Sequence, residues 1–249
     1  VGSFATLPAA TDTFLREYML ASALGEEVAA LGRVRPALWI LRSLAADTQD
    51  ETSTVALLAS FEAASFLGVG VGFVTEQQLQ NGTVPLGDVV IVPNTTFIED
   101  ASVLALQRRP PSSVVLASNT TSACLRYNPA GVPHPPSARD FLRNVTVIPI
   151  VPAPQMHPLF RTQLLPRIRA PPAWCVDASA PGAGPVFGVL CRFASMADGA
   201  AGGQRRLVGM VINMRADPLA VTVVTGDDQG GVVVAAAAVE LRDGAKVVL

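Results

Sequence analysis

Cysteine and histidine are the residues of this sequence whose side chains could support nucleophilic catalysis. The chain has three cysteines and two histidines, and the pair closest in sequence is Cys124 with His134. A thiol acts as a nucleophile when a neighbouring base takes its proton and a sharp strand-to-helix turn exposes it. Cys124 lies in "TSACLRY", without the glycines of such a turn, and His134 lies in a proline-rich loop. We therefore expect no catalytic residue, and a hydrolase that uses Cys124 is the weakest interpretation.

The sequence also lacks the usual patterns for binding a metal ion or a phosphate. The sequence has no Cys-x-x-Cys pair, and its histidines and cysteines are scattered, which does not favour a zinc site. Acidic residues occur as adjacent pairs at 26–27, 99–100 and 227–228, and neighbours on a helix point to different faces instead of flanking a sugar. The run "GVGVGF" opens a strand and leads into no helix whose N-terminus could hold a phosphate. The prediction is therefore no metal and no cofactor.

Asparagine occurs in an unusual context in this chain. Four of the six asparagines open an Asn-x-Ser/Thr triplet, namely Asn81, Asn94, Asn119 and Asn144. This triplet is the acceptor for N-linked glycans, and four copies indicate passage through a eukaryotic secretory pathway. The alternative is a chain whose loops are simply rich in threonine. We expect a secreted, extracellular protein that carries N-linked glycans.

The cysteine spacing agrees with an oxidising compartment. Cys175 and Cys191 flank a Gly/Pro-rich turn followed by an alternating run, as expected for two neighbouring strands. A disulfide between them would close a loop and contribute about 3 kcal/mol in the chain-entropy model. The alternative is two unpaired thiols in the core. In either case Cys124 has no partner assigned by the sequence.

Charge and hydropathy exclude several partners. Charged residues make up 15% of the chain, the net charge is -2 and Lys246 is the one lysine. Without a basic patch, nucleic acid is not an expected partner. The longest apolar run, at 232–239, is far shorter than the roughly 20 residues of a membrane span. Because the chain begins at Val1 without a charged leader, we expect either a removed signal peptide or a piece of a longer protein.

Apolar periodicity predicts an α/β fold. Residues 11–31 have helical spacing, and Gly32 and Pro36 would end that helix. Strands are then expected at 37–41, 71–75, 88–93, 113–118 and 145–150, with helices at 51–68 and 98–107. Strands that alternate with helices pair in parallel through helical crossovers. We therefore expect a flavodoxin- or amidotransferase-like parallel sheet with helices on both faces.

The carboxyl end of the strand at 88–93 is the expected place for a ligand, because open α/β sheets bind ligands at that edge. The residues that follow this strand are Asn94, Thr95 and Thr96. Turn and capping chemistry is the stronger interpretation, since Asn94 opens a glycosylation triplet and Thr96 could cap the next helix.

The second half of the chain changes character. Residues 119–172 are rich in proline, with short helices expected near 138–143 and 159–165. Four β-rich runs follow residue 173 and are separated by turn sequences such as "DDQGG" and "RDG", which predicts a small antiparallel β-sandwich of about six strands. The expected domains are a helical lead-in at 1–34, the α/β domain at 35–172 and the β-sandwich at 173–249.

This order of segments resembles the C-terminal half of glycoside hydrolase family 42 β-galactosidases. "FLREYMLASALGEEVAAL" is similar to the last helix of their catalytic barrel, and "RPALWILRS" to the first strand of an amidotransferase-like domain used in trimer assembly. "DVVIVPNTTFIEDASVLALQ" resembles a strand and helix of that domain, and "RRLVGMVINMRADPLAVTV" resembles the small terminal β domain. The family has Gly-Gly where this chain has "RRPPSS".

The resemblance implies an assembly role. The family's catalytic glutamates lie on barrel strands, and these 249 residues contain no barrel, so no catalytic residue is carried over. The implied function is a non-catalytic, accessory portion of a secreted β-galactosidase-like protein, with protein subunits and a barrel domain as partners. Trp174 could add carbohydrate binding, although packing is its more ordinary role. The alternative is a structural subunit of an extracellular coat, filament or wall.

Overall fold

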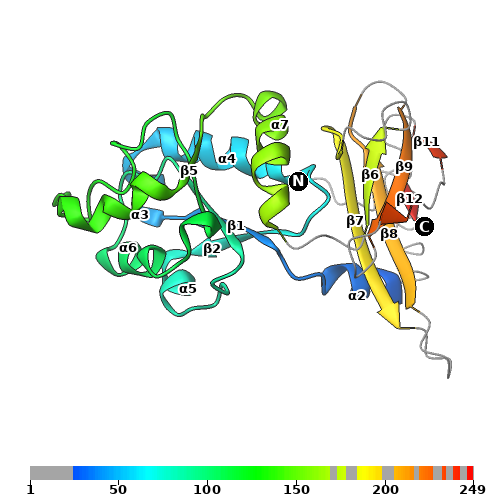
Figure 1. The fold of residues 1–249 in the computed structure, drawn as a ribbon, viewed down its shortest axis with the longest axis horizontal. Coiled ribbons are helices and arrows are strands. Elements are labelled where there is room, and N and C mark those ends of the chain that lie inside the picture. Colours follow the sequence, from blue (N-terminus) through cyan, green and yellow to red (C-terminus); the bar gives the residue numbers. More distant parts are fainter. Residues whose placement is uncertain are drawn as a thin grey trace, which may run out of the picture.

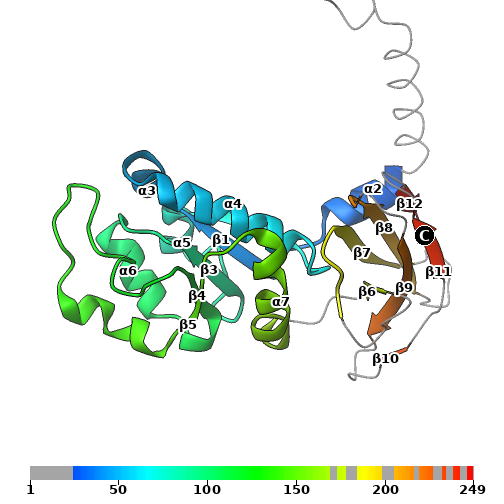
Figure 2. The ribbon, with the colours of Figure 1, turned by 90° about the horizontal axis from the view of Figure 1, so that it is seen from above.

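The first part of the chain builds a parallel sheet covered by helices, and the last part builds two antiparallel sheets (Figures 1 and 2). The computed structural model describes residues 25–168, 173–177, 184–197, 205–215, 219–226, 232–233, 238–241 and 246–248. The part of the first predicted helix before residue 25 and the acidic pair at 227–228 lie outside these residues. The fold class is the one that the sequence predicts.

The parallel sheet has the strand order β2-β1-β3-β4-β5, and every neighbouring pair runs in parallel. Its strands are β1 (Leu38–Arg42), β2 (Val71–Thr75), β3 (Val89–Pro93), β4 (Val114–Ala117) and β5 (Thr146–Ile148). The order reverses between β1 and β3, which makes their carboxyl ends the switch point where α/β proteins of this order hold ligands. All five residues of β3 are buried, as expected of a central strand covered on both faces.

Helices cover both faces of this sheet. The helical elements are α2 (Gly25–Gly32), α3 (Leu44–Gln49), α4 (Glu51–Ser65), α5 (Glu76–Gln80), α6 (Asp100–Gln107), η2 (Pro111–Ser113), η3 (Pro136–Asn144), α7 (Ala153–Gln163) and η4 (Leu165–Arg167). One hydrophobic cluster joins the sheet to α4 and α7 and includes Leu57, Met156 and Phe160. The cluster on the opposite face includes Leu79 of α5 and Leu106 of α6. Burial on both sides explains the nearly continuous apolar runs of the inner strands.

Three helices differ from the expectation. α3 and α5 are only five or six residues long, too short for their apolar residues to show a period. α7 begins at Ala153 instead of near residue 159 and continues through Pro158. Burial of Met156 and Phe160 against the sheet stabilises this turn despite the backbone hydrogen bond that a proline cannot donate.

The "GVGVGF" run has a packing role. A Cβ atom on Gly70 would lie 2.9 Å from the carbonyl oxygen of Arg35, and one on Gly72 would lie 2.8 Å from Cγ of Pro36. No larger side chain fits where β2 passes this close to the segment that enters β1. Gly70 and Gly72 of this run therefore serve close strand packing.

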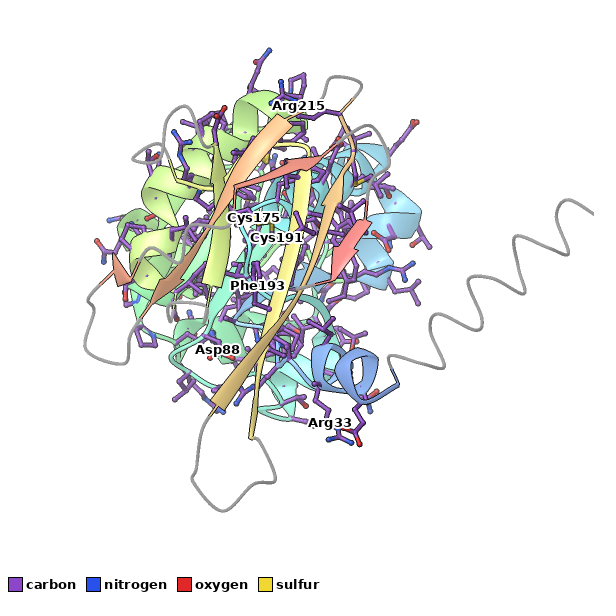
Figure 3. All side chains as sticks on the ribbon, turned by 90° about the vertical axis from the view of Figure 1, so that its right-hand side faces the viewer. Arg33, Asp88, Cys175, Cys191, Phe193 and Arg215 are labelled. Atoms are coloured by element: carbon purple, nitrogen blue, oxygen red, sulfur yellow. A yellow bond between two sulfur atoms is a disulfide. The ribbon has the colours of Figure 1, made fainter. Side chains whose placement is uncertain are left out.

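The C-terminal module consists of two antiparallel sheets. One contains β6 (Ala173–Asp177), β9 (Leu219–Gly226), β10 (Val232–Val233) and β11 (Ala238–Leu241), and the other contains β7 (Val189–Ala197), β8 (Arg205–Asn213) and β12 (Lys246–Val248). A disulfide joins Cys175 of β6 to Cys191 of β7 (Figure 3). These two strands belong to different sheets, so the disulfide links the sheets to each other.

Phe187 connects the C-terminal module to the α/β part. Its ring packs edge-to-face on Phe66, 4.7 Å between centroids, and on His157 of α7, 5.6 Å between centroids. Such aromatic pairs contribute about 0.5–1.5 kcal/mol beyond the area they bury. Helix α2 meanwhile lies against β7 and β8 (Figure 1). The segment that precedes β1 therefore contacts the C-terminal module.

His157 makes this contact sensitive to pH. Burial lowers the pKa of His157 below its usual 6.5; the carbonyl oxygen of Phe66 opposes that shift, and Arg161 adds to it. The unfolded chain therefore takes up a proton near pH 6.5, whereas the folded chain takes it up only at lower pH. We predict that the free energy of unfolding is constant above this pH and falls below it, by at most about 1.4 kcal/mol per pH unit for one proton.

The variant His157→Gln tests this prediction, because it keeps a donor for Phe66 but cannot titrate. Urea unfolding between pH 5 and pH 8 should show a shallower loss of stability for the variant than for the native chain. Identical slopes for the two proteins would show that His157 is not the group responsible.

Candidate functional site

The carboxyl ends of β1, β3 and β4 meet at the switch point of the parallel sheet. Ser43 follows β1, Asn94 follows β3 and Ser118 follows β4, and α4 begins nearby at its N-cap, Asp50. This is the edge at which the fold would hold a ligand. The polar side chains gathered here are therefore the candidate site, which we call the carboxyl-edge cluster: Asp50, Thr52, Asn94, Thr96, Ser118 and Thr120.

Both carboxylate oxygens of Asp50 accept hydrogen bonds. Oδ1 accepts from the backbone nitrogen of Thr52 at 3.0 Å and from its hydroxyl at 2.5 Å. Oδ2 accepts from the hydroxyl of Thr96 at 2.7 Å. Asp50 thus caps α4 and also holds the loop that follows β3.

These hydrogen bonds determine the charge of Asp50. Partial burial alone would raise the pKa of its carboxyl, but the donors Thr52 and Thr96, together with the backbone, outweigh it and lower the pKa below 3.8. Asp50 therefore stays ionised at neutral pH and serves as an acceptor. A general acid would need the opposite shift.

Asn94 continues the network toward β4. Its φ of 36° lies in the left-handed region, which asparagine tolerates better than most residues. The Thr52 hydroxyl donates to Asp50, so it accepts from Nδ2 of Asn94 at 2.7 Å. The Asn94 side-chain oxygen in turn accepts from the Ser118 hydroxyl at 3.0 Å. A strained turn after a strand is where some hydrolases place a nucleophile, and here it carries an amide.

The two threonines after Asn94 have different roles from those expected. Thr95 is buried, and its hydroxyl donates to the carbonyl oxygen of Pro93. The expectation that Thr96 caps the next helix is wrong, because α6 has Glu99 as its N-cap and Thr96 donates to Asp50 instead. A short turn separates Thr96 from α6, so its hydroxyl meets the start of α4 and not that of α6.

Cys124 and His134 do not form a catalytic pair. The thiol of Cys124 is fully buried and lies 3.6 Å from the carbonyl oxygen of Thr120. Burial raises the pKa of this thiol, and a contact with Ser118 offsets only part of that effect. The two ring nitrogens of His134 lie 3.1 Å from the carbonyl oxygen of Ile98 and 2.9 Å from a carboxylate oxygen of Asp100. Neither nitrogen is left to take a proton from the thiol.

The structure separates the four predicted glycosylation sites into two kinds. Asn81, Asn119 and Asn144 are exposed, at the end of α5, after β4 and at the end of η3. The side-chain oxygen of Asn119 accepts from the backbone of Ile150, which leaves its Nδ2 out of that bond. Asn94 is half-buried, and its Nδ2 is already bonded to Thr52.

Other expected features have plain structural roles. Trp39 is partly buried and donates from Nε1 to Asp88, and the Trp174 side chain lies outside the described residues. Within the ranges that the structure describes, no group of three or more His, Cys, Asp or Glu residues could hold a metal ion. No helix in those same ranges is long and apolar enough to cross a membrane.

Sequence reasoning missed Asp50, Thr52, Ser118 and Thr120 as members of the cluster. Ser118 follows a strand as Asn94 does, so the rule that placed Asn94 at the edge could have placed Ser118 there too. Asp50 and Thr52 precede and open a predicted helix, which indicates a cap but not a bond to β3. The contact between Thr52 and Asn94 spans 42 residues and leaves no local signal.

Comparison with known proteins identifies similar folds. No family model matches the sequence, and no curated protein matches it. Among solved structures, Gan42B, a GH42 β-galactosidase, superposes with a TM-score of 0.51 and 9% identity over 86% of this chain and 40% of that one. An exo-carrageenase GH42 from Bacteroides ovatus has a TM-score of 0.49 and 16% identity over 87% of this chain and 28% of that one. A rhamnosidase from Novosphingobium sp. PP1Y has a TM-score of 0.40 and 10% identity over 73% of this chain and 20% of that one.

These similarities concern the fold. The identities are too low to carry function, and this chain spans less than half of the length of each neighbour. The superposition on Gan42B extends over most of the chain, which indicates that the α/β part and the β module occur together in another protein. The chain therefore has a fold found in GH42 glycoside hydrolases.

Proposed function

We propose that this chain is a non-catalytic, accessory portion of a secreted and glycosylated protein related to GH42 β-galactosidases, with a role in assembly. It corresponds to the C-terminal half of such a protein. The observation that carries the proposal is the closed carboxyl-edge cluster. Its carboxylate, amide and hydroxyl groups bond to one another across three segments of the chain.

A closed network suits a scaffold better than a catalytic site. Asp50 and Asn94 make their side-chain hydrogen bonds to Thr52, Thr96 and Ser118, so these side chains position one another. Ser118 is buried, and leaving a buried hydroxyl unpaired costs about 1–3 kcal/mol. Catalytic groups, in contrast, keep hydrogen-bond donors or acceptors unbonded and directed at the substrate.

Export of the chain is supported by two independent features. Three of the predicted glycosylation asparagines are exposed on the folded chain, where a bulky glycan can be accommodated. The Cys175–Cys191 disulfide links the two sheets of the C-terminal module, and such bonds persist mainly in oxidising compartments. Together they favour an extracellular protein.

Incubation of the purified chain with aryl galactosides tests the absence of catalysis. We predict no turnover above the buffer rate, because no acid, base or nucleophile of the cluster is free. The variants Asp50→Asn and Cys124→Ser are the matched controls. Turnover that co-purifies with the native chain and disappears in either variant would overturn the non-catalytic assignment.

Glycan mapping of the chain secreted by eukaryotic cells tests the export proposal. We predict glycans on Asn81, Asn119 and Asn144 and none on Asn94, because Asn94 is half-buried and its Nδ2 lies 2.7 Å from the Thr52 hydroxyl, where a bulky glycan would be crowded. Enzymatic deglycosylation in H2¹⁸O followed by peptide mass spectrometry marks each occupied asparagine. The variant Thr83→Ala should remove only the mass label at Asn81. A high occupancy at Asn94, or empty sites at the other three, would contradict the prediction.

A further inference from the structure

The outer face of α4 carries large apolar side chains in a surface position. Val55, Leu58 and Phe61 expose 57%, 58% and 37% of their surface. Phe73 of β2, 44% exposed, stacks on Phe61 with ring centroids 5.1 Å apart and extends the surface beyond the helix. Single exposed apolar residues are ordinary, but a contiguous group marks a surface that another molecule covers. We call these four residues the α4 patch.

The spacing of the patch follows from the helix. Residues 55, 58 and 61 recur every third position along one side of α4, while the opposite side packs on the sheet. The buried residues of α4 are Ser53, Ala56, Leu57, Ser60, Ala63 and Ala64. Leu58 is the central residue of the fifteen in α4, and it points away from the middle of the buried side. Val55 and Phe61 lie one turn to either side of it.

We propose that the α4 patch binds the same patch of a second copy of this chain, with the two α4 helices antiparallel about a two-fold axis that passes by Leu58. This inference rests on the proposed assembly role and names the partner; the two-fold pair is a contact of a different kind from the trimer assembly that the resemblance implies. In such a pair Leu58 faces Leu58 of the second copy, and Val55 faces Phe61. Each apolar residue of the helix therefore meets an apolar residue, which is the self-complementarity that a two-fold interface requires.

The charges on α4 also favour this arrangement. Glu51 and Glu62 are exposed near the two ends of the helix. In the antiparallel pair, Glu62 faces Thr54 of the second copy and Glu51 faces Ser65, so every acid meets a hydroxyl. A parallel pair would instead place each glutamate beside its own copy, and like charges across an interface cost several kcal/mol.

Glycans on two of the three exposed glycosylation asparagines would leave this surface free. The exposed glycosylation asparagines Asn81, Asn119 and Asn144 lie after α5, after β4 and at the end of η3. α5 and η3 pack on the sheet face opposite α4, as the two hydrophobic clusters show. Figure 2 shows α4 along the edge of the molecule opposite β4 and β5. Glycans on Asn81 and Asn144 therefore leave the α4 patches free to meet, whereas Asn119 adjoins Ser118 and the hydrogen-bond network at the start of α4.

A two-fold contact through the α4 patch occupies that patch on both copies. An isologous interface uses the same surface on both copies and yields a discrete dimer, whereas a filament needs two different surfaces. The proposal therefore favours a closed assembly over the coat or filament alternative.

Cysteine cross-linking tests the axis directly. The variant Leu58→Cys should form a covalent dimer on mild oxidation, because helices packed about 8–10 Å apart bring facing residues into disulfide range. The native cysteines do not interfere, since Cys124 is buried and the other two are bonded to each other. Leu104→Cys on α6, where Leu104 is 52% exposed, is the matched control and should form no covalent dimer.

A mixture of single variants tests the antiparallel register. Val55→Cys mixed with Phe61→Cys should cross-link to each other, and each alone should cross-link far less. Equal cross-linking of Leu58→Cys and Leu104→Cys would show random collision and would overturn the proposal. Efficient cross-linking of Val55→Cys alone would overturn the register.

Sedimentation equilibrium of the full chain measures the dimer itself. We expect a dimer at micromolar concentration and an increase of about 100-fold in its dissociation constant for Leu58→Glu, since a central apolar contact is replaced by two facing carboxylates. Leu104→Glu should leave the constant unchanged, and circular dichroism should show both variants folded. A native chain that stays monomeric to about 100 μM contradicts the proposal, because a weaker contact is not a specific dimer. A monomer without galactosidase activity would overturn this inference alone, whereas an active dimer would overturn the non-catalytic function alone.

Discussion

The Asp50 carboxylate is the interaction on which the architecture of the carboxyl edge depends. It begins α4 by accepting from the backbone of Thr52, and it holds the loop after β3 by accepting from Thr96. Because Asp50 fixes the Thr52 hydroxyl as a donor, Thr52 must accept from Asn94, and Asn94 can then accept from Ser118. A single ionised group therefore fixes the Thr52 and Thr96 hydroxyls as donors, while the Ser118 hydroxyl lies 3.0 Å from the Asn94 side-chain oxygen and 2.8 Å from the carbonyl oxygen of Thr120.

At the sheet edge where related folds bind ligands, this chain instead has hydrogen bonds that hold loops and a helix together. In proteins with the same strand order, the switch point is open because the chain there leaves polar groups unpaired for a ligand. In this chain the same position joins the loops after β3 and β4 to one helix. The similarity to a GH42 protein concerns the fold alone, and one fold can serve different functions in different proteins. Helix α4 takes part in both the network and the proposed dimer contact, because its start is held by Asp50 and its outer face carries the α4 patch.

Much of the fold can be predicted from the sequence, because its signals are local. The strands β1 to β5 are short apolar runs bounded by turn residues, and the long helix α4 has clear ends. The short helices α3 and α5 have neither, and the extent of α7 depends on burial that outweighs Pro158. The pairing of Cys175 with Cys191 follows from their spacing, but their position on two different sheets depends on strand order that no local pattern carries. Thr96 shows the same limit, because the local sequence is the same whether its hydroxyl caps α6 or donates to Asp50.

A double-mutant cycle between Asp50 and Thr96 tests the central claim most directly. The free energies of unfolding of Asp50→Ala, Thr96→Val and the double variant are compared with that of the native chain by urea titration at neutral pH. The closed network predicts that both single variants are destabilised and that the two effects are coupled by about 1–2 kcal/mol, as expected for a hydroxyl bonded to a carboxylate. Effects that add within about 0.3 kcal/mol, or variants more stable than the native chain, would contradict it, because residues held in place for a ligand are commonly a cost to stability.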